Sequence, residues 1–464
     1  MTTEVTSIQH PGEERSNELR KRLTKTEPLA LRTFTPSLAL LDKSAGSYHW
    51  TPEGRKLADF SSGVLVANLG HNPTRWWRRV FDYLGVSDLD ESQEYTPAAP
   101  LTAYNAVNSL EVRANERLLA NMRAEVGGGR MEQVLWAASG SEAVQKALWA
   151  CLAFDKNRDV IVATRGGFHG KKGLAGAVTG GETDKERDPR VKFISFPKVE
   201  CADVELRKQP IDLEPYQHEL DKLGRELGDR LSCLITEPYL GGGGSYHPQP
   251  EYLQLLQKFC RDRGGLFILD EIQANFGRTG PMYAYTCYGV EPDIVCLGKG
   301  LGNGVPVSAA VGRADIFQAL HYGEGSDTWS ANPLSSAAVL ATLDEFEGGD
   351  VLARGQALAP IIEEGLQRLK TTGVIEKVRG EGCVWGIECA ACGSHEPEEV
   401  ANAVVEACYL GDPQGRAIHL LGPLAGRVIR ISPPLTMSPD ELREYLDVMH
   451  GILASLRLKL RTLG

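Results

Sequence analysis

Short, almost wholly apolar runs alternate with helix-like stretches through the middle of the chain. Val, Ile and Leu dominate these runs, and stretches with helical periodicity, such as Ser141–Phe154 and Tyr252–Arg263, lie between them. Unbroken apolar runs of this length are typical of strands buried on both faces of a parallel sheet, with the helices as crossovers. The expected strands are Val134–Ala137, Val160–Ala163, Leu231–Thr236, Leu266–Leu269 and Asp293–Leu297.

The pattern changes after about Asn332, where long helical stretches surround short strands near Cys383 and Val428. These helical stretches are Ser335–Glu347, Gln356–Leu369, Glu398–Ala407 and Asp440–Leu456. Towards the N-terminus, a polar segment precedes short strands and turns, and Thr51–Gly54, which contains Pro and Gly, is expected to form a turn. We therefore expect a large α/β domain with a mostly parallel sheet covered by helices, plus a smaller α+β domain.

These shifts in pattern predict four segments along the chain. Residues 1–28 form an arm that is mobile or ordered by a partner subunit. Residues 29–64 pack with the small domain, residues 65–332 form the large domain, and residues 333–464 form the C-terminal small domain.

Composition limits the classes of partner. The chain has 464 residues, 42% hydrophobic and 24% charged, with a formal net charge of −11. Such a charge repels phosphate backbones and anionic membranes, so neither nucleic acid nor a membrane is expected as a partner. The apolar stretch Leu29–Leu41 is short and interrupted by Arg32, and the N-terminus lacks an apolar signal-peptide core, so we expect a cytoplasmic protein.

The ten cysteines are scattered, and several, such as Cys233 and Cys296, lie in apolar runs where free thiols behave as small hydrophobes. One cluster comprises Cys383, Cys389, Cys392 and His395. A structural zinc site usually requires two cysteine pairs and only one is present, so packing is favoured over zinc. The sequence assigns no metal ligand.

Polar residues follow three of the expected strands. Glu237 follows the first, Asp270 the second, and Lys299, flanked by two glycines, the third. Ligands of open α/β sheets bind at the carboxyl ends of strands, so we expect these residues to face one crevice. For the lysine taken alone, a solvated surface position is the structural alternative.

Two further features suggest an anionic ligand with a cationic ring. The run Trp136–Glu142 is a strand, a turn and a helix start, whose free N–H groups and two hydroxyls suit a phosphate, although Ser139 or Ser141 could equally cap the helix. Asp270 at a buried strand end needs a cation, and a protonated pyridine nitrogen would supply one. The alternative, a magnesium-binding carboxylate of a nucleotide hydrolase, needs a phosphate loop of the Walker type, which the chain lacks, and no dinucleotide fingerprint is present.

Taken together, these motifs are similar to those of one family. Over about residues 30–445, the chain resembles the class III (ornithine/ω-amino acid) aminotransferases, which have fold type I of the pyridoxal 5′-phosphate (PLP) enzymes. The segments that carry the resemblance are Ser139–Ala143, Phe168–Gly170, Glu237–Pro238, Asp270–Gln273, Phe276–Gly280, Pro292–Val295, Gly298–Gly302, Asn332–Leu334 and Arg430–Leu435.

The resemblance implies a role for each matched position. Lys299 would bind PLP as a Schiff base and then carry the proton between substrate and cofactor. Asp270 would pair with the pyridine nitrogen and Gln273 would reach the phenolic oxygen. Ile272 would pack on one face of the ring and Phe168 on the other.

The same resemblance assigns the phosphate site to Gly140 and Ser141, with Ser139 beside them. Thr328 would bind the phosphate of a neighbouring subunit, which implies a homodimer with shared active sites. The matched motifs also place His169 and Glu237 at the cofactor.

Arg430 matches the arginine that binds a substrate carboxylate, where its planar fork suits the ligand. A structural ion pair is the alternative for this residue. Ornithine-, acetylornithine- and 4-aminobutyrate-type members carry a glutamate that pairs with this arginine, and the matching position here is Gly242. This departure favours ω-amino acids or amines as donors over ornithine and acetylornithine.

The resulting hypothesis is a homodimeric ω-aminotransferase with a ping-pong cycle and a 2-oxo acid (pyruvate or 2-oxoglutarate) as acceptor. The same scaffold would also serve a decarboxylating transaminase or an aminomutase, because substrate pose selects the bond that breaks. A PLP-fold protein that binds without turnover is the alternative from a different class.

Overall fold

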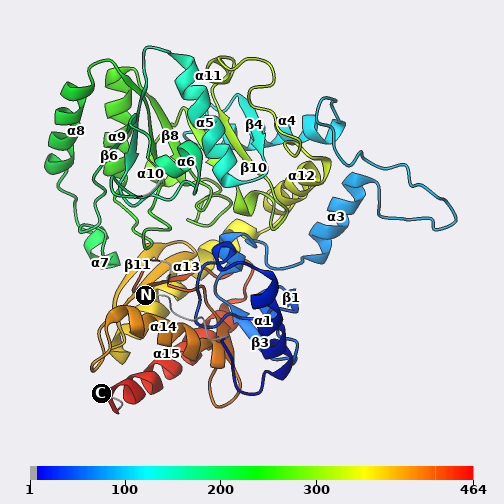
Figure 1. Cartoon of the computed structure of the whole chain (residues 1–464), viewed down its shortest axis with the longest axis vertical. Coiled ribbons are helices and arrows are strands. Elements are labelled where there is room, and N and C mark those ends of the chain that lie inside the picture. Colours follow the sequence, from blue (N-terminus) through cyan, green and yellow to red (C-terminus); the bar gives the residue numbers. More distant parts are fainter. Residues whose placement is uncertain (1–7, 185–186, 424, 463–464) are drawn as a thin grey trace. The chain divides into compact units, whose positions relative to one another are not determined.

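The structure is a computed structural model that describes residues 8–184, 187–423 and 425–462. The chain forms two units (Figure 1). The larger unit is Thr74–Leu352, and the smaller one combines Met1–Pro73 with Ala353–Gly464.

The sheet of the larger unit has the strand order β4-β10-β9-β8-β7-β5-β6. All neighbouring pairs are parallel except those of β10, which runs antiparallel to both β4 and β9. The strands are β4 (Gln133–Ala137), β5 (Val160–Thr164), β6 (Val191–Ile194), β7 (Leu231–Thr236), β8 (Leu266–Asp270), β9 (Ile294–Leu297) and β10 (Ser308–Gly312). The five strands expected from the apolar runs are confirmed, whereas β6 and β10 were not predicted.

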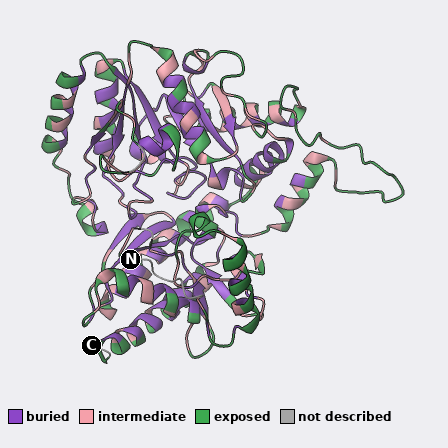
Figure 2. Cartoon of the chain, in the orientation of Figure 1, coloured by how far each residue is buried: buried purple, intermediate pink, exposed green. Residues whose placement is uncertain are grey.

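Buried strands and covering helices explain why these runs are apolar throughout. Alternate strand residues such as Cys233, Ile268 and Ile294 pack with helix α5 (Gly140–Phe154) in one core cluster. The intervening residues point to the other face, where α9 (Pro250–Arg263) contacts β7 and β8. The five strands β5, β7, β8, β9 and β10 are consequently buried at every position, whereas the edge strands β4 and β6 are partly exposed (Figure 2).

The remaining helices of the larger unit connect and cover the sheet. They are α3 (Thr74–Leu84), α4 (Ser109–Ala124), α6 (Gly173–Ala177), α7 (Val204–Arg207), α8 (Glu214–Leu227), α10 (Ala284–Tyr288), the 3-10 helix η2 (Lys299–Leu301), α11 (Ala314–Phe317) and α12 (Pro333–Gly348).

Helix α12 lies in the larger unit, whereas the sequence placed residues after 332 in the C-terminal domain. It packs against α3 and α4, and the indole N–H of Trp76 on α3 donates to Thr342 Oγ1 at 3.0 Å. The helix is buried on several sides because its residues are mostly small and apolar. The two units therefore meet in sequence at Leu352–Ala353 rather than at residue 332.

The smaller unit contains two sheets. One has the order β1-β2-β3-β13 and the other β11-β12-β14. The strands are β1 (Lys43–Ala45), β2 (Tyr48–Trp50), β3 (Lys56–Asp59), β11 (Ile375–Glu381), β12 (Val384–Cys389), β13 (Ala417–His419) and β14 (Val428–Ile431). The helices are α1 (Glu14–Thr26), η1 (Leu29–Leu31), α2 (Ser62–Leu65), α13 (Val351–Leu369, which begins in the larger unit), η3 (Lys370–Thr372), α14 (Pro397–Leu410) and α15 (Pro439–Thr462).

The N-terminal segment differs from the predicted mobile or partner-ordered arm. Its described part contains α1, and Arg20 on this helix is fully buried. The Arg20 guanidinium donates to Glu13 Oε2 at 2.7 Å and to the Tyr409 hydroxyl at 3.0 Å, and Arg55 also pairs with Glu13. The chain's own smaller unit thus holds this segment through a buried ionic network, which the polar sequence alone concealed. Residues 1–7 lie outside the described residues.

Cys383, Cys389 and Cys392 are buried free thiols, and the first donates to Gly355 O at 3.3 Å. None of the helices in the described ranges combines the length and apolar character needed to cross a bilayer.

Candidate active site

Parallel pairing brings the three polar strand ends together. Because β7, β8 and β9 are neighbours that run in the same direction, Glu237, Asp270 and Lys299 emerge at one edge of the sheet. They line one cavity of about 170 Å³. The lining residues are Gly140, Ser141, Phe168, His169, Glu237, Asp270, Ile272, Gln273, Lys299 and Ser308.

Backbone geometry presents Lys299 to this cavity. Lys299 has φ of 47°, in the left-handed region that non-glycine residues rarely adopt. The preceding Gly298 is required by a close approach, since a Cβ there would lie 2.7 Å from Ser308 Oγ. The lysine therefore occupies a partly buried, strained position in the cavity, not the solvated surface position that was its structural alternative.

Asp270 is a buried carboxylate with a histidine partner. It is 3% exposed, and its Oδ2 lies 2.7 Å from His169 Nδ1 while its Oδ1 accepts the Ile272 N–H at 3.1 Å. Burial lowers the pKa of His169, but the hydrogen bond and charge of Asp270 outweigh that effect and raise the pKa above its ordinary value. The Asp270 carboxylate is thus held in a fixed position at the cavity wall.

Glu237 anchors two loops around the cavity. Its carboxyl group accepts the N–H of Phe168 at 2.8 Å and of Gly241 at 3.1 Å. Burial raises the pKa of Glu237 to about 7, although His169 and the two N–H groups oppose the rise. The glutamate therefore positions Phe168 through its backbone.

The first turn of helix α5 lines the cavity. Ser141 and Gly140 lie in the first turn, whose N–H groups suit a phosphate. A Cβ at Gly140 would lie 2.8 Å from Ile272 Cδ1, so the close packing here needs glycine. Ser139 is the N-cap in a capping box with Glu142 and is absent from the cavity lining, in keeping with its helix-capping alternative.

Two further predicted site residues are not among the residues that line this cavity. Thr328 is in an exposed loop whose neighbour Asp327 accepts from the buried Lys146 Nζ at 2.7 Å. Arg430 lies in β14 of the smaller unit and is 7% exposed. Their roles at the cofactor and substrate remain predictions.

Sequence reasoning missed Ser308 as a cavity residue and Lys146 as the support of the Thr328 loop. Ser308 begins β10, whose Ser-Ala-Ala-Val-Gly sequence carries no strong strand signal. Lys146 is one polar position on a largely apolar helix, and nothing in its local pattern indicates a partner 181 residues away.

The cavity fits PLP. It combines a primary amine, a buried carboxylate for a protonated ring nitrogen and a helix N-terminus for the phosphate. It also holds buried polar atoms, Gln273 Oε1 and His169 Nε2, that have no hydrogen-bond partner among the described residues and could serve a polar ligand. With the parallel α/β sheet, these features define fold type I of the PLP-dependent enzymes.

Known proteins agree with this assignment. The structure of ornithine aminotransferase from Toxoplasma gondii superposes with a TM-score of 0.78 at 21% identity, covering 97% of both chains. 4-aminobutyrate aminotransferase from Mycobacterium leprae is 30% identical over 97% of both chains. 2-aminoadipate transaminase from Pseudomonas putida is 31% identical over 88% of this chain and 94% of its own length.

The family model for "Aminotransferase class-III" matches residues 31–453. The chain therefore belongs to the class III aminotransferases, and it is a transaminase with pyridoxal 5′-phosphate as its cofactor.

Proposed function

We propose that this enzyme works as a cytoplasmic homodimer that takes amino groups from ω-amino acids or amines and gives them to a 2-oxo acid in a ping-pong cycle. The observation that carries the donor preference is the packing at Gly242. A Cβ at this position would lie 2.9 Å from Phe168 Cβ, so the loop has no room for the glutamate that other members use there. Because position 242 is glycine, it offers no carboxylate that would compete with the substrate carboxylate for Arg430.

When bound, the cofactor accepts the electron pair of a bond at the substrate's amino-bearing carbon, which makes that carbon's proton removable. Lys299 holds the cofactor through its Nζ and, once released, carries a proton at that atom. Asp270 keeps the ring nitrogen protonated, and His169 holds the Asp270 carboxylate in place by its Nδ1 contact of 2.7 Å.

Other residues orient the ligand. Ile272 and Phe168 would sandwich the ring, the Gln273 amide would meet its phenolic oxygen, and Gly140 with Ser141 would hold the phosphate. All five line the same cavity, which supports these roles.

Arg430 would hold the carboxylate of the acceptor acid with its planar fork. Its strand position and low exposure of 7% support a fixed orientation. Thr328 would reach the phosphate of the partner subunit, and Lys146 supports this role by fixing the loop at Asp327.

The donor assignment is tested with the purified holoenzyme by single-turnover reactions without acceptor. β-alanine, 4-aminobutyrate, a primary monoamine, ornithine and N-acetylornithine are compared by the rate at which each changes the absorbance of the cofactor. We expect β-alanine and the monoamine to react faster than 4-aminobutyrate, ornithine and acetylornithine, whose enzymes carry the glutamate that Gly242 replaces. Faster reaction of ornithine or acetylornithine would overturn the donor preference but leave the transaminase assignment intact.

Product analysis distinguishes the other reactions that the scaffold could support. Release of CO₂ in step with turnover would indicate a decarboxylating transaminase, and an isomerised amino acid without need for an acceptor would indicate an aminomutase. An enzyme that binds the cofactor and exchanges no amino group with any donor would be a binding protein. We expect a ketone or aldehyde product and dependence on a 2-oxo acid, with Arg430→Gln raising KM for that acid.

A further inference from the structure

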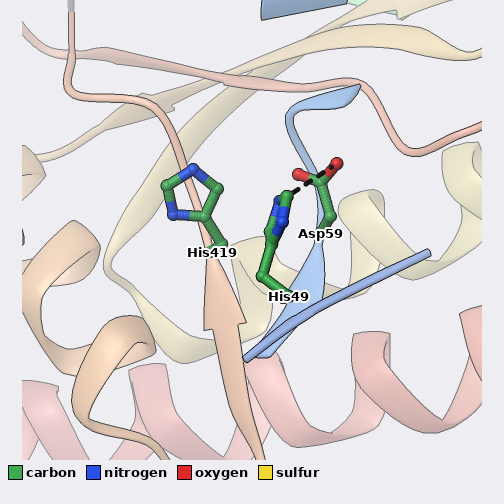
Figure 3. A group of neighbouring side chains, drawn as sticks. All are labelled: His49, Asp59 and His419. Carbon is green, nitrogen blue, oxygen red and sulfur yellow. Dashed lines mark ion pairs between the residues drawn. The ribbon is translucent and has the colours of Figure 1, made fainter. Parts of the chain in front are cut away.

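Two N-terminal residues and one C-terminal residue converge on one face of the β1-β2-β3-β13 sheet. His49 pairs with Leu57 across β2 and β3, and Asp59, two residues further along β3, pairs with His419 on β13. Residues paired across strands share a face, and so do residues two apart on one strand. The register therefore places His49, Asp59 and His419 together (Figure 3).

Their ligating atoms form a compact group. One imidazole nitrogen or carboxylate oxygen from each residue lies within 4.8 Å of the other two. Among the residues that the structure describes, this is the one set of three His, Cys, Asp or Glu side chains gathered closely enough for a metal ion. All three residues belong to the smaller unit, separate in sequence from the cavity residues of the larger one.

Two buried nitrogens of this group are unsatisfied. His49 is 2% exposed, and its Nε2 lies 3.6 Å from Asp59 Oδ2, beyond hydrogen-bond reach. Neither His49 Nε2 nor His419 Nδ1 has a hydrogen-bond partner in the described part of the chain. A buried polar atom left in this state destabilises the fold, and a bound ion would remove that penalty.

Asp59 places a carboxylate in the group. It is fully buried, and within the described ranges its ion-pair partners are the two histidines His49 and His71, with no Lys or Arg. A buried carboxylate is stable only when a cation meets it.

Hydrogen bonds from neighbouring residues orient these side chains, as is usual for metal ligands. Ser44 Oγ lies 2.7 Å from His49 Nδ1, so it can accept that N–H and leave the Nε2 lone pair directed at the group. His71 Nε2 lies 2.7 Å from Asp59 Oδ2, and Ser61 donates its backbone N–H to Asp59 Oδ1 at 2.7 Å. Histidine and carboxylate ligands of metals are characteristically supported by such second contacts.

We propose that His49, Asp59 and His419 form a binding site for a divalent transition-metal ion, Zn²⁺ in particular. Two imidazoles and a carboxylate are ligands that Zn²⁺ accepts, with water at the fourth position. Bonds of about 2.0–2.1 Å in tetrahedral geometry place ligand atoms roughly 3.3 Å apart, so the widest pair must close by about 1.5 Å. With its ligands closed around it, the ion ties the N-terminal strands β2 and β3 to the C-terminal strand β13.

Metal binding is tested on the full-length holoenzyme after dialysis against a chelator and removal of the chelator. Calorimetric titration with ZnCl₂ is expected to show one ion bound per chain. His49→Gln and His419→Gln should weaken binding by on the order of 100-fold or more, and Ser44→Ala by about 10-fold. Two matched controls, His218→Gln on an exposed position of α8 and His395→Gln beside the cysteine cluster, should bind as the parent does.

A second measurement does not depend on the variants folding. Co²⁺ added to the unsubstituted chain should give the intense visible absorption of a four-coordinate site, and Zn²⁺ should abolish it by displacement. Weak, octahedral-type Co²⁺ absorption would overturn the proposal. So would Zn²⁺ binding that is unchanged in both histidine variants, or that is lost only in His395→Gln. None of these readouts uses amino-group transfer, so failure of this site and failure of the donor assignment are distinguishable.

Discussion

Replacement of Asp270 by asparagine tests how the cavity controls the cofactor. The substitution keeps the size of the side chain but removes its charge. Asp270 is 3% exposed and its Oδ2 lies 2.7 Å from His169 Nδ1, so the charge is desolvated and already committed to a fixed direction. The asparagine would leave a protonated ring nitrogen without its counter-charge.

The size of the effect follows from this burial. Breaking a buried ionic pair by removing one partner costs about 3–5 kcal/mol. At about 1.4 kcal/mol per tenfold change in rate, Asp270→Asn should slow the donor half-reaction by on the order of 10²–10⁴-fold. His169→Gln keeps the carboxylate and removes one hydrogen bond to it, which is worth about 1.5–3 kcal/mol, so the loss should be roughly 10–100-fold.

The assay is single-turnover absorbance of the cofactor with saturating donor, after each variant has been shown to carry a full complement of cofactor and to unfold at a temperature near that of the parent. We expect the parent to react fastest, His169→Gln more slowly and Asp270→Asn most slowly. An Asp270→Asn enzyme within tenfold of the parent, or one faster than His169→Gln, would refute the argument that the buried charge drives the reaction.

Three further results are expected from other parts of the chain. Burial raises the pKa of Glu237 from 4.5 to about 7, so its contribution to stability is complete below about pH 4.5 and is lost as the pH rises through 7. Between pH 5 and 8, the free energy of unfolding of the parent apoprotein in urea should fall by up to about 3 kcal/mol relative to Glu237→Gln. A difference between the two that does not change with pH would contradict this. Arg20→Met leaves the buried Glu13 short of one partner and should lower the free energy of unfolding by about 3 kcal/mol, measured by urea denaturation, whereas no change would show that Arg55 alone suffices. Lys146→Met removes the ion pair that holds the loop at Asp327, and it should weaken cofactor binding about tenfold in equilibrium dialysis with little change in the stability of the chain. Unchanged binding would show that this loop does not contribute to holding the cofactor phosphate.

Much of the fold was predictable because burial imposes a simple pattern. The run Leu231–Thr236 coincides with β7, and Tyr252–Arg263 falls within α9. The strand β10 was not predicted because its small residues resemble those of a loop. Its antiparallel direction depends on neighbouring strands that the sequence does not reveal. The sequence placed α12 in the wrong unit because an apolar helix can be buried in either one.

The chemistry was predictable where the residues lie at strand ends. Lys299 and Asp270 could be placed in one crevice because parallel neighbours end at the same edge. The support of Asp270 by His169, 101 residues earlier, could be expected only from the family resemblance. The cluster of His49, Asp59 and His419 could not be foreseen, because only the strand register brings position 419 beside position 59.

The central claim is that Lys299 holds the cofactor and moves the substrate's proton. The most direct test is the absorbance spectrum of the purified enzyme before and after addition of β-alanine or a monoamine, for the parent and for Lys299→Ala. In the parent, we expect a visible band of the bound cofactor that shifts when the donor is added. In Lys299→Ala, we expect this band to be missing or not to respond to the donor. A parent enzyme that shows no cofactor band after PLP is supplied, or a Lys299→Ala enzyme that transfers amino groups at the parent's rate, would contradict it.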